Sequence, residues 1–588
     1  MRLIFDIEAN SLTPDIVHCI VARDVDTDEE YVFRPDQLEA GLELLAQADC
    51  LIGHNIMAYD LPALKNIFDF DYEGEVRDTL VMCRLIWSDV KNKDFTLYHA
   101  GKLPPKMIGS HSLKAWGYRL GELKGEFGEQ EDFDVFTEQM LEYCRQDVKV
   151  NKRLFSKIES KNYSEDAIKL EHEVHHHLLV QEYLGFPFDE QAGWKLYGEL
   201  SNRRTEIEAE LQEVFLPWRE ETEFIPKVNN KKLGYVKGEP FIKVKETVFN
   251  PCSREHIARA LRERYDWQPD EFTETGLAKV DETVLSALNY PEAKLLSEYL
   301  MLQKRLGQIG EGKQAWLKLV KKGKIHGRVN HMGTHTSRCT HSQPNCGQIP
   351  SAGAVYGSAC RSLFTAPSGF RLVGCDVSGL ELRCLAHYMA LYDGGEYARQ
   401  LLNGDIHTTN MEAAGLPSRS LAKTFIYGFL YGGGDEKIGS IVGKDAKAGR
   451  RLKAQFLKKT PALAKLRDNV SKAAENRGYL KVLDGRRVPV RHKHASLNTL
   501  LQSTGAIICK RWLVEFHRKM QAEGFVLGED YYQAAFVHDE LQIIAKESIT
   551  ERVGALCVEA IKDAGEAYNF RLRLDGEFNV GKNWAETH

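Results

Sequence analysis

Residues 534–544 read AAFVHDELQII, two apolar runs that flank His538, Asp539 and Glu540. Short apolar runs on both sides of a polar tip predict a β-hairpin with the three polar residues at its turn. Tight hairpin turns favour Asn-Gly or Asp-Gly, because their central residues require a positive φ. Adjacent carboxylates are therefore unfavourable here, and their presence indicates a functional site. Because neighbouring strand residues face opposite ways, we expect Asp539 to act in that site and Glu540 to contribute less.

The composition is that of a large globular protein. The chain has 588 residues, 43% of them hydrophobic and 28% charged, and at roughly 100–200 residues per domain this predicts three or more structural units. The formal net charge of −6 opposes binding to nucleic acid over the whole surface, although basic stretches occur at 227–238, 318–328 and 481–494. The scattered cysteines form no CxxC pair, the chain starts with the strand-like MRLIFDIEAN, and no apolar run reaches ~18 residues. These features favour a cytosolic protein with reduced thiols.

The pattern of apolar residues changes along the chain. The first ~165 residues alternate strand-like and helix-like segments, which predicts a compact α/β domain. Residues 195–320 are mostly helical and charged, with an interruption rich in Lys, Gly and Asn near 226–247. Further along, the strand RLVGCDV (371–377), a helical region over 380–480 and the hairpin at 534–544 predict a second region of mixed structure.

Two short motifs match known patterns without the context that those patterns require. HEVHH (172–176) has the spacing of zinc proteases, but no third ligand follows at a recognisable distance, so we interpret it as a polar helix face. GQIGEGKQ (307–314) has the spacing of a phosphate-binding loop, but Gln314 replaces the Ser or Thr that binds Mg²⁺, and a helix precedes it. We interpret it as a loop between helices.

Four carboxylates in the N-terminal region suit a metal site. Asp6 and Glu8 lie two apart on one strand and therefore point to one face, and Asp60 follows a second strand-like segment. Tyr143 and Asp147 are four apart and share a helix face. Carboxylates of this kind suit Mg²⁺ or Mn²⁺, and two such ions ~4 Å apart activate water and stabilise the leaving oxygen of a phosphodiester. The hydroxyl of Tyr143 is a candidate to orient that water.

A second group of candidate residues lies in the C-terminal half. Asp376 ends an apolar strand immediately before a helix, where its carboxylate is available to a ligand. In a later helix, four residues recur at intervals of four and form one stripe: Arg419, Lys423, Tyr427 and Tyr431. The repulsion between Arg419 and Lys423 favours an anionic partner such as a triphosphate, with a solvated basic face as the alternative. Aromatic rings on the same stripe suit stacking on a base.

Both groups resemble the sites of known enzymes. The order D-x-E, D, Y-x-x-x-D resembles the proofreading 3′–5′ exonucleases of the DEDD type, tyrosine variant. DVSGLELR (376–383), the stripe at 419–431 and VHDE (537–540) resemble motifs A, B and C of family A DNA polymerases. The resemblance narrows to the T-seven type of phage replicative polymerase through the segments 109–126, 248–257, 403–410, 422–439 and 497–510. It covers almost the whole chain.

This resemblance implies a fold and a division into domains. It implies a ribonuclease H-like α/β exonuclease domain at residues 1–165, a linker helix at 166–190 and an α+β polymerase domain shaped as a right hand. The helical thumb would span 191–312, with a shortened insertion near 216–247. The palm, an antiparallel sheet, would comprise 313–385 and 497–588, and the helical fingers would span 386–496.

The resemblance also implies ligands and roles for individual residues. Asp376 and Asp539 would hold two Mg²⁺ ions at the polymerase site, with Mn²⁺ as a substitute, and Glu540 would support them from behind. Two further ions would be held at the exonuclease site by Asp6, Glu8, Asp60 and Asp147.

The nucleotide and DNA contacts follow in the same way. The dNTP phosphates would be bound by His407, Arg419 and Lys423, with Lys423 as the acid for the leaving pyrophosphate. Tyr427 would lie against the incoming sugar and base, and Tyr431 near the templating base. Glu381 would fill the space of a 2′-OH and so favour deoxynucleotides. Contacts to primer-template DNA would come from Arg338, Asn345, Gln348, Gln502 and His538.

The sequence departs from the family pattern at a few places. Ser337 stands where the family usually has Gly, which alters a local turn, and Cys346 stands where Leu is common. In the family's best-known member, a long thumb insertion recruits host thioredoxin. The corresponding segment here is far shorter, which argues against thioredoxin binding. The retained basic loop at 227–238 is either a DNA-tracking loop or a solvated hairpin.

These features predict a phage replicative DNA-directed DNA polymerase with an active proofreading exonuclease. Its partners would be primer-template DNA, dNTPs, a phage helicase-primase and a single-strand-binding protein, in the bacterial host cytoplasm. Glu381 and the N-terminal carboxylates oppose a single-subunit RNA polymerase. A non-catalytic relative would tolerate loss of metal carboxylates, yet all the candidates are present. A dedicated exonuclease would leave the stripe at 419–431 unexplained.

Overall fold

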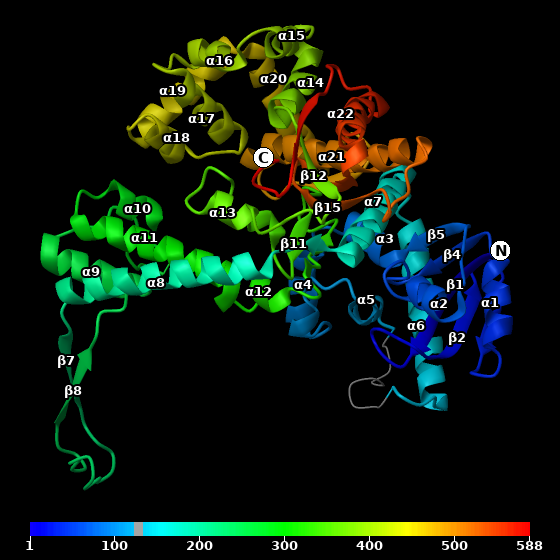
Figure 1. Cartoon of the computed structure of the whole chain (residues 1–588), viewed down its shortest axis with the longest axis horizontal. Coiled ribbons are helices and arrows are strands. Elements are labelled where there is room, and N and C mark those ends of the chain that lie inside the picture. The colour runs from blue at the N-terminus through cyan, green and yellow to red at the C-terminus, as the bar shows by residue number, and fades with distance from the viewer. Residues whose placement is uncertain (123–132, 274, 588) are drawn as a thin grey trace. The chain divides into compact units, whose positions relative to one another are not determined.

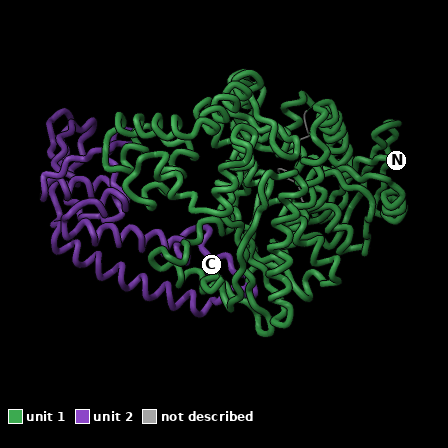
Figure 2. The backbone as a smooth tube through the Cα atoms, turned by 90° about the horizontal axis from the view of Figure 1, so that it is seen from above, with its two compact units in different colours: residues 1–186, 326–588 green, residues 187–325 purple. Residues whose placement is uncertain are grey.

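The computed structural model describes residues 1–122, 133–273 and 275–587, and the chain divides into two compact units (Figure 2). Unit 1 comprises Met1–Phe186 and His326–His588, and unit 2 comprises Pro187–Ile325. Residues 123–126 of the family-like segment 109–126 lie outside the described residues. Among the described residues, no helix is long and apolar enough to cross a membrane.

Unit 1 begins with a five-stranded mixed sheet. Its strands are β1 (Arg2–Ala9), β2 (Val17–Asp24), β3 (Glu30–Phe33), β4 (Cys50–Gly53) and β5 (Glu75–Asp78), in the order β3-β2-β1-β4-β5. The β1-β2 and β2-β3 pairs are antiparallel, and the β1-β4 and β4-β5 pairs are parallel. The alternation of strands and helices predicted for this region is observed.

The central strand β1 is covered on both faces. Its successive side chains point to opposite faces of the sheet, and apolar residues occur on each face. Leu3, Phe5 and Ile7 belong to a buried cluster that includes residues of α1 (Leu38–Ala46) and α2 (Asp60–Phe68). Ile4 belongs to a second cluster that includes residues of α3 (Thr79–Ile86) and α6 (Glu138–Glu159). The remaining helices of this region are α4 (Val90–His99) and α5 (Leu113–Leu120).

A second sheet of unit 1 is entirely antiparallel. Its strands are β12 (Phe370–Val377), β15 (Tyr531–Val537), β16 (Glu540–Lys546) and β17 (Gly576–Gly581), in the order β15-β16-β12-β17. The helix α22 (Thr550–Ala567) packs on β12 and β17, and α7 (Glu165–Leu184) packs on β15. The long helix α21 (Ser496–Ala522) is joined to α22 by the buried Trp512, whose Nε1 donates to the carbonyl of Cys557 at 2.8 Å.

Helices fill the chain between β12 and α21. They are α14 (Leu380–Asp393), α15 (Glu396–Asn403), α16 (Ile406–Ala414), α17 (Arg419–Leu430), α18 (Asp435–Ile441), α19 (Ala446–Lys459) and α20 (Pro461–Arg477). The small hairpin β13 (Tyr479–Lys481) and β14 (Arg487–Pro489) leads into α21. Before β12, the short hairpin β10 (Arg328–Asn330) and β11 (Thr340–Ser342) is followed by α13 (Gly357–Arg361).

Unit 2 is a helical body with one projecting hairpin (Figure 1). Its helices are α8 (Glu190–Val214), α9 (Arg254–Tyr265), α10 (Glu282–Ala287), α11 (Pro291–Leu306) and α12 (Trp316–Leu319). The hairpin consists of β7 (Trp218–Phe224) and β8 (Phe241–Thr247), and the basic loop 227–238 forms its tip. Phe224, Tyr235 and Phe241 pack edge to face at the base of that tip, with ring centroids 4.7–6.0 Å apart.

The two motifs that lacked their usual context have structural roles. In GQIGEGKQ, residues Gly307–Glu311 form a turn of π-helix that continues α11, and Glu311 accepts hydrogen bonds from Arg204 at 2.7 and 2.9 Å. In HEVHH, the Nε2 atom of His172 accepts from the backbone N–H of Asp78 at 2.8 Å, and Glu173 pairs with Arg518 at 2.8 Å. HEVHH lies in helix α7, as predicted. The prediction of a loop is wrong for Gly307–Glu311, because the N–H of Gly312 bonds to the carbonyl of Gly307 five residues earlier and the helix continues through them.

Gly374 in β12 provides a test of how closely the C-terminal sheet is packed. A Cβ atom there would lie 2.5 Å from Nε2 of Gln542 and 2.5 Å from the carbonyl of Thr587. We expect Gly374→Ala to lower the free energy of unfolding by about 1–3 kcal/mol, the usual cost of overpacking, and a thermal melt measures it. Gly434→Ala is the control, because a Cβ there meets nothing within 4 Å. Equal melting temperatures for the two variants would contradict this packing.

Candidate functional site

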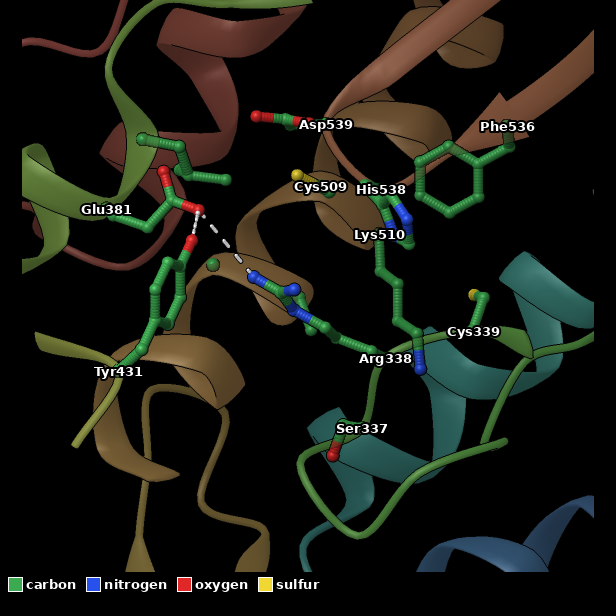
Figure 3. Close-up of a pocket in the computed structure, with 13 residues that line it drawn as sticks. Ser337, Arg338, Cys339, Glu381, Tyr431, Cys509, Lys510, Phe536, His538 and Asp539 are labelled. Atoms are coloured by element: carbon green, nitrogen blue, oxygen red, sulfur yellow. Dashed lines mark hydrogen bonds and ion pairs between the residues drawn. The ribbon is translucent and has the colours of Figure 1, made fainter. Parts of the chain in front are cut away.

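A cavity of about 190 Å³ lies in unit 1, beside the turn between β15 and β16 (Figure 3). It is bordered by the loop before β11, the start of α14, the end of α17, the middle of α21 and the β15-β16 turn. Its lining residues are Ser337, Arg338, Cys339, Leu380, Glu381, Tyr431, Gly505, Ala506, Cys509, Lys510, Phe536, His538 and Asp539.

The predicted hairpin is present, and its turn lies beside Asp376. The Asp376 residue pairs in register with Glu540, and the backbone N–H of the next residue, Val377, donates to the carbonyl of Asp539 at 3.1 Å. His538 has a φ of 59°, the left-handed conformation that makes His an unfavourable turn residue. Burial, followed by the nearby charges of Glu381 and Asp376, raises the pKa of Asp539 to about 6. Negative charge is therefore concentrated at this turn.

Glu540 faces the other way, as expected for a neighbouring strand residue. It is 5% exposed, and its Oε1 atom accepts hydrogen bonds from Nε1 of Trp584 and, at 2.7 Å, from Nε2 of Gln542. The Nη1 atom of Arg361 lies 3.6 Å from the same oxygen. Asp539 borders the cavity and Glu540 does not, so the two neighbouring carboxylates lie in different surroundings, as the alternation of a strand predicts.

Glu381 is held in the cavity by two neighbours. The hydroxyl of Tyr431 donates to its Oε1 atom at 2.9 Å, and Nη2 of Arg338 lies 3.7 Å from the same oxygen. Burial and the negative charge of Glu381 raise the pKa of Tyr431 to about 12, so this phenol remains a donor at neutral pH. The dashed lines in Figure 3 mark both contacts.

The predicted stripe at 419–431 is formed by α17. This helix starts after Ser418, whose side chain accepts from the N–H of Leu421, and Tyr431 caps its end. Its buried face carries Ala422, Phe425, Ile426, Phe429 and Leu430, and the opposite face exposes Arg419 and Lys423. The rings of Tyr427 and Tyr431 stack with centroids 6.4 Å apart, and the ring of His407 lies 6.5 Å from Tyr427.

Asp405 is a partner of this stripe that sequence reasoning missed. Its Oδ2 atom lies 2.6 Å from Nε of Arg419, and its Oδ1 accepts from the backbone N–H of His407 at 3.1 Å. The hydrogen bond from Arg419 holds the pKa of Asp405 well below its usual range. The position of Asp405 before an apolar helix start is an N-cap signal that could have identified it.

The N-terminal carboxylates gather around β1. Oxygen atoms of Asp6 and Glu8 and the sulfur of Cys144 lie within 4.8 Å of one another, and this is the one such group of three potential metal ligands among the described residues. The Oδ1 atom of Asp60 accepts from the backbone N–H of Ile7, between Asp6 and Glu8, at 3.3 Å. Burial raises the pKa of Asp60 to about 7 against the effect of its backbone hydrogen bonds.

The remaining members of this group lie on α6, which packs on β1. Tyr143 is half-buried and Asp147 is buried, and Cys144 lies between them in the sequence. The thiol of Cys144 donates to the carbonyl of Asp6 at 3.5 Å, and burial raises its pKa well above the usual range. Sequence reasoning missed Cys144, because a lone cysteine in a helix gives no signal of its neighbours in space.

Comparison with known proteins agrees with this geometry. Residues 227–586 match the description DNA polymerase family A. The chain is 40% identical to the DNA-directed DNA polymerases of Enterobacteria phage T3 and Escherichia phage T7, with all of this chain and all of each relative covered. This chain belongs to DNA polymerase family A. It is a DNA-directed DNA polymerase of the phage type.

The solved structures agree in fold. The polymerase domain of Pol1 from M. smegmatis, in complex with DNA primer-template and dNTP, aligns with a TM-score of 0.75 and 16% identity over 100% of this chain and 96% of that one. The alignments with the phage relatives extend over 706 positions, whereas this polymerase has 588 residues. The relatives therefore contain segments that this polymerase lacks.

The candidate DNA-contacting residues of this polymerase are only partly brought together. Arg338 and His538 border the cavity. Gln502 does not border it, and its Oε1 atom lies 3.5 Å from Oγ1 of Thr336 in the loop before β11. Asn345 is half-buried and Gln348 is exposed, and neither borders the cavity.

The departure at Ser337 has a structural consequence for this polymerase. Its φ is 66°, so a buried residue with a Cβ occupies the left-handed region that favours glycine. The turn is closed by the N–H of Arg338, which donates to Oγ1 of Thr334 at 3.1 Å. Arg338 therefore reaches the cavity from a strained turn.

We expect Ser337→Gly to raise the free energy of unfolding by up to about 1 kcal/mol, because glycine removes the left-handed strain at this φ. Thermal melting measures the change. Ser337→Ala is the control, since it removes the hydroxyl and keeps the Cβ. A gain from Ser337→Ala as large as that from Ser337→Gly would show that the strain is absent.

Proposed function

We propose that this polymerase extends a DNA primer by two-metal phosphoryl transfer at Asp376 and Asp539 and removes mispaired 3′ nucleotides at its N-terminal carboxylates. The observation that supports the first part is the β15-β16 turn, where the backbone hydrogen bond from Val377 to Asp539 brings the end of β12, with Asp376, next to the turn that carries Asp539 at the cavity.

The donor sets of both sites fit hard divalent cations. Asp376 and Asp539 at the turn, and Asp6, Glu8, Asp60 and Asp147 around β1, offer oxygen ligands of the kind that Mg²⁺ and Mn²⁺ prefer. Burial, together with the charges of Glu381 and Asp376, raises the pKa of Asp539, and a bound cation would stabilise its charged form. Bound in pairs, such cations supply charge neutralisation and activation of the attacking oxygen.

The stripe on α17 is suited to the triphosphate. Arg419 and Lys423 are exposed on one helix face, and His407 lies at the start of the neighbouring α16. We infer that incoming phosphates replace Asp405 as the partner of Arg419, and that Lys423 donates a proton to the leaving pyrophosphate. Stabilising the charge on the transferring group is the main catalytic effect in this chemistry.

In this proposal, the cavity selects the sugar and holds the new base pair. Glu381 would occupy the space of a 2′-OH, held in place by its hydrogen bond from Tyr431. Tyr427 would lie against the incoming sugar and base, and Tyr431 near the templating base. Contacts to primer-template DNA would come from Arg338, Asn345, Gln348, Gln502 and His538, and Glu540 would support the turn from behind.

The N-terminal site supports a proofreading exonuclease. The strand order β3-β2-β1-β4-β5 is consistent with a ribonuclease H-like fold, and Tyr143 on α6 would orient the attacking water. In this proposal, residues 1–165 form the exonuclease, 166–190 the linker helix, 191–312 the thumb, 313–385 and 497–588 the palm, and 386–496 the fingers. The enzyme would act in the bacterial host cytoplasm with a helicase-primase and a single-strand-binding protein.

The two active sites can be separated by substitution. We expect Asp376→Ala or Asp539→Ala to lower primer extension with dNTPs by more than about a hundredfold, since each removes an oxygen ligand for a catalytic cation. Degradation of single-stranded DNA should persist. Asp6→Ala combined with Glu8→Ala should have the reverse effect. Gel assays of extension and degradation measure both activities, and extension by the Asp376→Ala variant would refute the polymerase-site assignment.

Processivity should not depend on thioredoxin. Only the short β7-β8 hairpin stands where a recruiting insertion would lie, so we expect equal product lengths with and without thioredoxin on a long primed single strand. Longer products with thioredoxin would contradict this.

The same assay decides the role of the basic loop. Lys231→Glu combined with Lys232→Glu shortens the products if the tip tracks DNA and leaves them unchanged if the hairpin is only solvated. Lys243→Glu and Lys245→Glu on the arm of the same hairpin form the matched control.

A further inference from the structure

Beneath the cavity, Glu171 of α7 is the centre of a fully buried ionic cluster. Its Oε1 atom accepts from Nζ of Lys510 and from Nη1 of Arg486, both at 2.6 Å. Its Oε2 atom lies 2.9 Å from the same Lys510 ammonium and 2.6 Å from Nδ1 of His331. Burial alone would raise the pKa of Glu171, but the cations of Lys510 and Arg486 hold it well below its usual range. No residue of this cluster has a role in the function proposed above.

The charges of the cluster are balanced in two pairs. Arg486 is bound on its other side by Asp484, through contacts of 2.6–3.0 Å to both carboxylate oxygens. Lys510 has only Glu171 as a carboxylate partner among its described contacts, together with the sulfur of Met332 at 3.5 Å. Because His331 is buried and its pKa is lowered to about 4, it adds no positive charge at neutral pH. Loss of Glu171 would therefore leave the Lys510 ammonium as the uncompensated charge.

Lys510 belongs to the wall of the cavity as well as to this cluster. It borders the same space as Asp539 and Glu381. Figure 3 shows its side chain running away from Asp539, so that the nitrogen lies at the far end, toward Cys339. A lysine side chain is a flexible stem with a strongly hydrated point charge. Without its buried partner, the ammonium would turn into the cavity, which Asp539 and Glu381 also line.

We propose that Glu171 is a positioning residue: it holds the Lys510 ammonium out of the cavity and so preserves the affinity of Asp376 and Asp539 for divalent cations. The inference rests on the metal-binding function proposed for these two residues. An ammonium beside them would compete with a cation for the same oxygens and repel it, an effect that is large at short range in a partly buried site. Glu171 touches neither Asp376 nor Asp539, and acts through Lys510.

Equilibrium binding of Mn²⁺ tests the inference without any turnover. The full chain carrying Asp6→Ala and Glu8→Ala, which weaken the N-terminal site, is titrated with Mn²⁺ alone and followed by electron paramagnetic resonance. We expect Glu171→Gln in this background to weaken binding at the Asp376 and Asp539 site by at least about tenfold. Adding Lys510→Met to Glu171→Gln should restore the affinity, because the displaced ammonium is then absent. A purely structural role for Glu171 would give no such rescue.

Three further variants make the outcome decisive. Arg486→Met removes another buried cation from Glu171 but none from the cavity wall, and it should leave Mn²⁺ affinity unchanged. Glu171→Asp keeps the charge and should weaken Mn²⁺ binding by a smaller factor. If Glu171→Gln fails to fold, this variant carries the test, and adding Lys510→Met to it should again restore the affinity. Asp539→Asn should abolish the titrated site; if it does not, the metal assignment fails, and the inference with it. If Mn²⁺ affinity is unchanged in Glu171→Gln and Glu171→Asp but lost in Asp539→Asn, the inference about Glu171 is overturned and the metal assignment stands.

Discussion

The register of β12 between β16 and β17 is the constraint on which the C-terminal site depends. Asp376 pairs with Glu540 on one side and Glu577 on the other, and Val377 donates to the carbonyl of Asp539. A slip of one residue would turn every side chain of β12 to the opposite face of the sheet. Leu372 and Val373 face opposite sides of the sheet and both are fully buried, so a slip would force each side chain into packing that fits the other. The apolar packing of the sheet thus fixes the position of a charged group at its end.

The molecule compensates its carboxylates in contrasting ways. Glu171 is buried among Lys510, Arg486 and His331, and the two cations keep it ionised. Asp539 is also largely buried, and this burial, with the nearby carboxylates of Glu381 and Asp376, raises its pKa. Around Glu171, the negative charge is balanced by cations of the chain itself. The second site concentrates negative charge at a cavity, which is the arrangement expected where a cation from outside the chain completes the balance.

Local features of the site were predictable because they depend on residues close in the sequence. The hairpin around AAFVHDELQII, the different orientations of Asp539 and Glu540, and the stripe of α17 all follow from the periods of strands and helices. Asp6 and Glu8 share a face of β1 for the same reason. Tyr143 and Asp147 lie on one predicted helix, which the structure places against β1. The identity of the family also follows from such local motifs, and the comparisons confirm it.

The contacts that only the tertiary structure decided join residues far apart in the chain. Glu171 meets Lys510 across 339 positions and Arg486 across 315, and Cys144 meets Asp6 across 138. The sequence by itself determined the hairpin at the site, the helix stripe at 419–431, the shared face of Asp6 and Glu8 and the motifs that identify the polymerase. It did not determine which charges would be buried together, because the energy of a buried ion pair depends on the distance between its partners and the exclusion of water around them. Both are set only when the helices and sheets have packed.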